Sequence, residues 1–265
     1  MEYTMKKQLM LFLAASASFS LSAEVHTDLS DWVVENQEET SANWTYEGET
    51  NSWLQSVNTS DYTFLYDPSL TSLGKAISGT ISVNTTSDDD YIGFVVGYQP
   101  GDYRNAEADY LLLSWKQADQ GALAGGMFLY HIEGGVHTGT SRKYSMTELQ
   151  PSADYEGVGW EDFVDYTFDI AYDQGYLAIF VNDDLQYSLT PGEIGETYFS
   201  DGAFGFYNFS QSHVEYGSVI YDDVDVLISE EQVANIAEAV PVSGNGILFS
   251  AMFAFGAFVR RNLKK

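Results

Sequence analysis

Short apolar segments alternate with polar turn residues along most of the 265-residue chain. Val, Ile, Tyr, Phe and Trp dominate the apolar segments, and these residues favour β-strands. Gly, Asn, Asp and Ser separate the segments, which is typical of tight turns. The pattern predicts strands at 53–58, 62–66, 77–84, 91–99, 109–117, 125–133, 166–172, 175–182, 185–189, 202–209 and 219–228.

Two of the separating stretches predict hairpin turns. Asp-Gln-Gly at 173–175 and Asn-Asp-Asp at 182–184 contain residues that tolerate the backbone angles of such turns. Only the stretch near 229–240 has a helical pattern, and we expect residues 229–239 to form a linker or stalk. Many short strands with almost no helix predict an all-β fold, an antiparallel two-sheet sandwich in one domain.

The N-terminus has the layout of a secretory signal peptide. Lys6 and Lys7 precede an apolar run from Leu9, and small residues follow up to Ala23. The apolar run is short for a membrane-spanning helix. We therefore expect residues 1–23 to be a cleaved signal, followed by a sandwich domain over 24–228.

The C-terminus combines a Pro/Gly break, an apolar run over 247–259 and a basic end. This order resembles the bacterial PEP-CTERM sorting signals, and Val240–Pro241 lies where that family has Pro-Glu-Pro. The resemblance implies that residues 240–265 form a sorting signal whose short apolar helix enters the membrane. It also implies export, transient membrane retention and processing by a sorting protease at a bacterial cell surface.

The charge of the chain is strongly unbalanced. Between residues 24 and 239 there are 38 acidic residues and five basic ones (Lys75, Arg104, Lys116, Arg142 and Lys143), which leaves a charge of about −33. Such a surface repels phosphate backbones, so we expect no nucleic-acid partner. The chain has no cysteine, which excludes disulfides and thiolate chemistry.

Several segments, in order, carry a resemblance to a known family. They are Asp31 to Gln37, "SGTISVNTTSDDDYIGFVVGYQ" (78–99), "DYLLLSWKQ" (109–117), "HTG" (137–139), "GWEDF" (159–163) and "GAFGFYNFSQ" (202–211). Over roughly residues 32–226 the chain resembles the C-terminal lectin-like domain of the thrombospondins. The resemblance implies a concanavalin-like jelly-roll sandwich that binds calcium in extracellular proteins of adhesion and matrix. The preceding calcium-binding repeats of that family and an Arg-Gly-Asp sequence are both missing.

Asp88, Asp89 and Asp90 are the candidate metal ligands. Three adjacent carboxylates repel one another and need water, a basic partner or a cation to compensate them. Ca²⁺ prefers such hard oxygen ligands, and the resemblance favours it over a solvated acidic loop. If the stretch is extended, Asp88 and Asp90 act together while Asp89 faces elsewhere.

Aromatic side chains in loops are the candidate sugar platforms. Tyr103 and Tyr155 are the weak ligand candidates, whereas Trp160 is better explained as part of the fold. No carboxylate pair has the spacing typical of glycoside hydrolases, and no nucleophile or zinc motif is present in the sequence. We therefore expect a protein without enzymatic activity.

Three functions stay open on the sequence alone. The first is an exported, cell-surface, calcium-binding lectin-like module that binds an extracellular glycan or matrix polymer. The second is an enzyme that acts on polysaccharide with an unrecognised carboxylate pair. The third is a structural biofilm or coat component.

Overall fold

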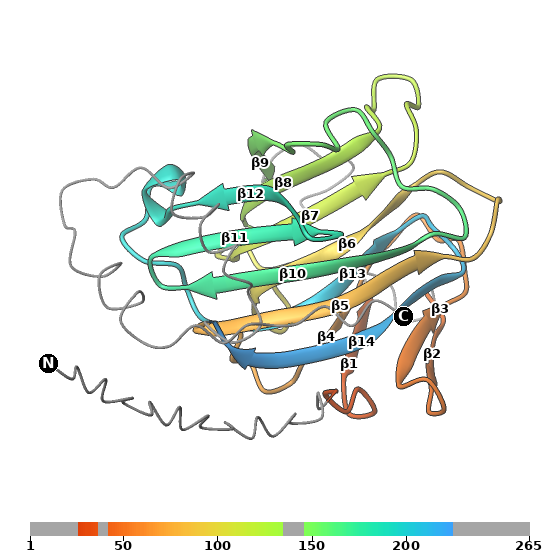
Figure 1. Ribbon diagram of the computed structural model, residues 1–265, viewed down its shortest axis with the longest axis horizontal. Helices are drawn as coiled ribbons and strands as arrows, with labels where there is room; N and C mark the ends of the chain where they lie inside the picture. Colours follow the sequence, from red (N-terminus) through yellow and green to blue (C-terminus); the bar gives the residue numbers. More distant parts are fainter. Residues whose placement is uncertain (1–25, 37–41, 135–145, 225–265) are drawn as a thin grey trace, which may run out of the picture.

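The computed structural model describes residues 26–36, 42–134 and 146–224. Two antiparallel sheets of seven strands each pack face to face (Figure 1). The first sheet has the order β1 (Val33–Asn36), β4 (Tyr62–Tyr66), β13 (Ala203–Phe209), β6 (Tyr91–Tyr98), β7 (Asp109–Lys116), β8 (Gly126–Glu133) and β9 (Met146–Pro151). The second has the order β12 (Asp184–Leu189), β11 (Tyr176–Val181), β10 (Asp165–Asp173), β5 (Lys75–Val83), β14 (Val214–Asp223), β3 (Ser52–Gln55) and β2 (Trp44–Glu47).

The predicted all-β sandwich is confirmed. Apart from one 3₁₀ turn, η1 (Pro191–Ile194), every described element is a strand. Both predicted hairpin turns are present: Gln174 and Gly175 join β10 to β11, and Asn182 and Asp183 join β11 to β12. Asn182 and Asp183 have φ of 53° and 72°, the left-handed values that such a turn requires.

The prediction of strands was incomplete. It missed β1, β2 and β9, which are short strands at or next to the edges of the sheets, with a weak apolar pattern. It also began the last strand at 219, whereas β14 begins at Val214. A strand with one open edge and mixed polarity has little periodic signal for sequence reasoning to detect.

The main core lies between the two sheets. Phe94 and Phe204 of the first sheet contact Phe168 of the second, with ring centroids 5.2 and 5.7 Å apart. The opposite, outer face of the first sheet is also apolar, because β13 buries residues on both of its faces. This outer-face cluster consists of Tyr62, Phe64, Tyr66, Val95, Tyr98, Tyr103, Ala108, Tyr110, Leu112, Ile132, Ala203, Tyr207 and Phe209.

The antiparallel order gathers six connections that the structure describes in full at one end of the sandwich. Residues 56–61, 84–90, 117–125, 152–164, 182–183 and 210–213 connect strands there, at the right of Figure 1 where β5 ends and β10 begins. We call this the Asp88 end. In the described residues no helix has the length and apolar character to span a membrane. The predicted signal peptide, linker and sorting signal lie outside the described residues, as do residues 24–25 and 225–228 at the two ends of the predicted sandwich domain.

Candidate functional site

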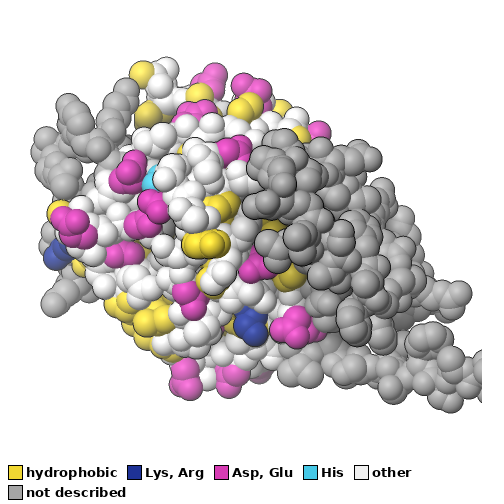
Figure 2. Space-filling view, turned by 90° about the vertical axis from the view of Figure 1, so that its left-hand side faces the viewer, with side chains coloured by type: hydrophobic (Ala, Val, Ile, Leu, Met, Phe, Trp, Pro, Cys, Tyr) yellow, Lys and Arg dark blue, Asp and Glu magenta, His cyan; other side chains and the backbone are white. Residues whose placement is uncertain are grey.

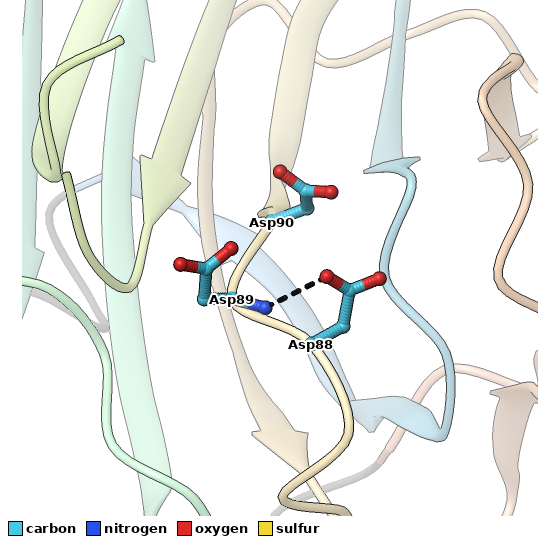
Figure 3. Close-up of side chains that lie close together, drawn as sticks. All are labelled: Asp88, Asp89 and Asp90. Atoms are coloured by element: carbon cyan, nitrogen blue, oxygen red, sulfur yellow. Dashed lines mark hydrogen bonds between the residues drawn. The ribbon is translucent and has the colours of Figure 1, made fainter. Parts of the chain in front are cut away.

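The three aspartates lie in the loop just before β6 rather than in a strand. Each offers a carboxylate oxygen within 4.8 Å of the others (Figure 3). Asp88 has φ of 135°, and its Oδ1 accepts a hydrogen bond of 3.0 Å from the backbone N–H of Asp89. In Figure 3 the carboxylates of Asp88 and Asp90 lie on one side of the backbone and that of Asp89 on the other, so which of the three would act together on an ion stays a prediction.

Lys116 compensates two of these carboxylates. It is the last residue of β7, and its side chain is fully buried. Its Nζ donates to Asp89 Oδ1 at 3.0 Å, to the Asp89 carbonyl at 2.8 Å and to Asp90 Oδ1 at 2.9 Å. These three bonds use all the donors of an ammonium group. Burial by itself lowers the pKa of Lys116, but the bonds to Asp90 and Asp89 outweigh burial and raise it, so the ammonium stays charged.

Trp160 closes the other side of this cluster. Its Nε1 donates to the carbonyls of Asp90, at 3.1 Å, and of Trp115, at 3.2 Å. The indole is 1% exposed, which confirms that it belongs to the fold. The backbone N–H of Asp90 donates to Gln211 Oε1 at 3.0 Å. The segments that carry the sequence resemblance, around 88–90, 115–117, 159–160 and 211, thus converge on one hydrogen-bonded cluster.

Asp88 is the carboxylate that Lys116 does not contact directly. It accepts a hydrogen bond from Asn58 Nδ2 as well as from the backbone of Asp89. Burial raises its pKa, and the neighbouring Asp90 and Asp89 add to this. Three carboxylates and one ammonium leave a formal charge of −2. Carboxylate oxygens are ligands that Ca²⁺ prefers, so Asp88, Asp89 and Asp90 are the residues that could hold such an ion.

The two tyrosines predicted as weak sugar ligands lie at opposite ends of the sandwich. Tyr103 is 8% exposed, and the Arg104 guanidinium lies 5.0 Å from its ring centroid. Tyr155 is half-buried at the Asp88 end, where its ring packs 4.7 Å from that of Trp115. The structure does not bring these two rings together.

Sequence reasoning missed a second aromatic pair, on the outer face of the first sheet. Phe128 and Tyr130 alternate along β8, opposite Ser114 and Leu112 of β7. Their rings lie 6.1 Å apart with 28° between their planes, and both side chains are half-buried. Burial, followed by the nearby Glu148, raises the pKa of Tyr130, so its hydroxyl remains a hydrogen-bond donor. The sequence signal that could have revealed this pair is the alternation of Phe128, Leu129 and Tyr130 along β8, which places the two aromatic rings on one face.

Comparisons with known proteins agree with this architecture. The chain is 29% identical to bovine (Bos taurus) thrombospondin-2 over 168 residues, and 28% identical to human (Homo sapiens) thrombospondin-2 over 168 residues. Each match covers 56% of this chain but only 14% of the thrombospondin. The chain is similar in sequence to thrombospondins. No family model matches it.

Solved structures share the fold at low sequence identity. The carbohydrate-binding module CBM66 from Bacillus subtilis superposes with a TM-score of 0.51 and 10% sequence identity. The superposition covers 74% of this chain and 96% of the module. At this identity the similarity concerns the fold alone.

Proposed function

We propose that the chain is a lectin-like module that binds an extracellular glycan or matrix polymer. The half-buried pair of Phe128 and Tyr130 carries this proposal, because two neighbouring aromatic rings, one of which carries a hydroxyl, offer stacking and hydrogen bonding together. The similarity to thrombospondins and the fold shared with a carbohydrate-binding module support it. They also support an extracellular or lumenal location. We further propose that the module binds without catalysis.

The charge of the molecule indicates which glycans fit. Asp and Glu are scattered over the end of the molecule opposite the Asp88 end, with few Lys or Arg among them (Figure 2). At the Asp88 end the one described Lys or Arg is Lys116, which is buried and already bound to Asp89 and Asp90. Glu148 lies near Tyr130 on the proposed glycan-binding face, and together with this overall excess of acidic side chains it repels sulfated and uronic-acid polymers. We therefore propose a neutral polysaccharide as the ligand.

Affinity electrophoresis and calorimetry on neutral and anionic polysaccharides test this proposal. Binding should be confined to neutral polymers, and replacing Phe128 and Tyr130 together by Ala should weaken it at least tenfold. Tyr198→Ala is the matched control, since Tyr198 is 63% exposed at the opposite end of the sandwich. Unchanged affinity in the double variant, with its melting transition intact, would reject the proposed surface.

The same samples separate the other two functions. Release of reducing sugar from a bound polymer would indicate an enzyme. Calcium-dependent growth in light scattering without glycan binding would indicate a structural coat or biofilm component. Export from a bacterial cell, loss of residues 1–23 and processing within 240–265 by a sorting protease stay predictions, which the intact mass of the exported protein checks.

A further inference from the structure

Exposed apolar side chains gather at the Asp88 end. Five large hydrophobic side chains are exposed in the described part of the chain, and three of them lie there. Val57 is 39% exposed in the 56–61 loop, while Val158 and Phe163 are 50% and 65% exposed in the 152–164 loop. Exposed apolar side chains that gather on one surface indicate an interaction site more than scattered ones do.

Phe163 is presented by a fixed backbone. Its φ is 62°, in the left-handed region that a bulky side chain rarely adopts. Its backbone N–H donates to the Val83 carbonyl at 2.8 Å, which ties the loop to the end of β5. The backbone of Val158 in the same loop is also held, since its carbonyl accepts a hydrogen bond of 2.9 Å from the indole Nε1 of Trp115. The backbone that carries the exposed Phe163 ring is therefore held in place by hydrogen bonds.

Hydrogen bonds connect the loops of this end into one surface. Asn58, next to Val57, donates to Asp88, and the N–H of Gln117 donates to the Asp89 carbonyl at 3.2 Å. Gln117 Nε2 then donates to Asp162 Oδ1 at 3.2 Å, beside Phe163. The chain of bonds runs from the loop of Val57 to the loop of Phe163, so these loops are fixed relative to one another.

This apolar surface is surrounded by carboxylates. Glu156 and Glu161 are exposed in the 152–164 loop, and Asp88, Asp89 and Asp162 are half-buried. Of the Lys and Arg residues in the described ranges, Lys75 and Arg104 lie at the opposite end of the sandwich. Lys116 is fully buried. The Asp88 end therefore offers no accessible Lys or Arg side chain from the described residues, although His213 is exposed there.

We propose that the Asp88 end binds a basic protein segment whose apolar side chain packs against Phe163 and whose Lys or Arg residues face the surrounding carboxylates. Charge complementarity of this kind steers association and selects the partner. It disfavours a second copy of this acidic chain and an anionic lipid surface, both of which would bring like charges together. The surface is separate from Phe128 and Tyr130, so it does not depend on the proposed glycan binding.

Fluorescence anisotropy with a labelled amphipathic Lys/Leu peptide tests the proposal. Two further peptides replace Lys by Glu or Leu by Ser. We expect the Lys/Leu peptide to bind at least tenfold more tightly than either of the other two. Phe163→Gly should weaken the binding of the Lys/Leu peptide at least tenfold. Glycine accepts the left-handed backbone, so this variant should keep its melting temperature. The double variant Glu156→Gln/Glu161→Gln should weaken binding and reduce its dependence on salt, whereas Tyr198→Ala should change neither.

Two outcomes would overturn the proposal. Equal binding of the Lys/Ser peptide would show that the polyacidic protein attracts any polycation without using the apolar side chains. Full affinity in a folded Phe163→Gly variant would show that the exposed ring is not part of the surface.

Discussion

Replacing Lys116 by Met should destabilise the protein strongly. The substitution keeps the length of the side chain but removes the ammonium that donates to Asp89 Oδ1, the Asp89 carbonyl and Asp90 Oδ1. Removing one partner of a buried ion pair leaves an uncompensated charge and costs about 3–5 kcal/mol of unfolding free energy. For a domain of this size, that loss lowers the melting temperature by roughly 6–20 °C.

Urea unfolding followed by circular dichroism measures the loss directly. The midpoint should fall without a change in slope, since the surface exposed on unfolding stays the same. Lys75→Met is the matched control, because Lys75 is only half-buried and lies at the opposite end of β5 from the cluster. The triple variant Lys116→Met/Asp89→Asn/Asp90→Asn should regain most of the lost stability, since neither former partner of Lys116 then carries a charge.

The pH dependence gives an independent check. The native pKa of Lys116 is raised above its ordinary value of 10.5, so the native state holds this proton more tightly than the unfolded chain does. The stability that this contributes is fully present below pH 10.5 and is lost as the pH rises through the native value. If Lys116→Met lost no more stability than Lys75→Met at neutral pH, the bonds from Lys116 to Asp89 and Asp90 would make no net contribution to the stability of the fold.

Three further predictions follow from the same structure. Ca²⁺ at a hundredfold excess over Kd should add about 2.7 kcal/mol of stability beyond that of sodium chloride at matched ionic strength. Asp88→Asn should remove that calcium-specific part in thermal melts; an unchanged response would leave Asp88 without a role in calcium binding. Gly159→Ala should unfold the domain, because its Cβ would lie 1.7 Å from the Gln117 carbonyl oxygen, whereas Gly175→Ala, with nothing within 4 Å, should melt normally. Burial raises the pKa of Asp102, so stability measured by urea unfolding should rise as the pH falls through its native pKa, and Asp102→Asn should abolish that rise.

Much of the sheet structure could be predicted from local pattern. The segments that became β4, β6, β7 and β8 have apolar and aromatic residues at strand spacing, bounded by turn residues. The short β1, β2 and β9 at or near the sheet edges could not be found in this way, because few of their residues are buried and their polarity is mixed. The candidate metal ligands Asp88, Asp89 and Asp90 were found as a cluster, but their partner was not.

The sequence alone was enough to determine the antiparallel sandwich and the presence of three adjacent acids, since alternation along a strand and neighbouring charges are local properties. The tertiary structure decided how those acids are compensated. Lys116 lies 26 residues beyond Asp90, and only the pairing of Tyr91 with Lys116 between β6 and β7 brings its ammonium to the aspartates. Register depends on how both sheets bury their faces together. A contact set by that register has no signal in either segment taken separately.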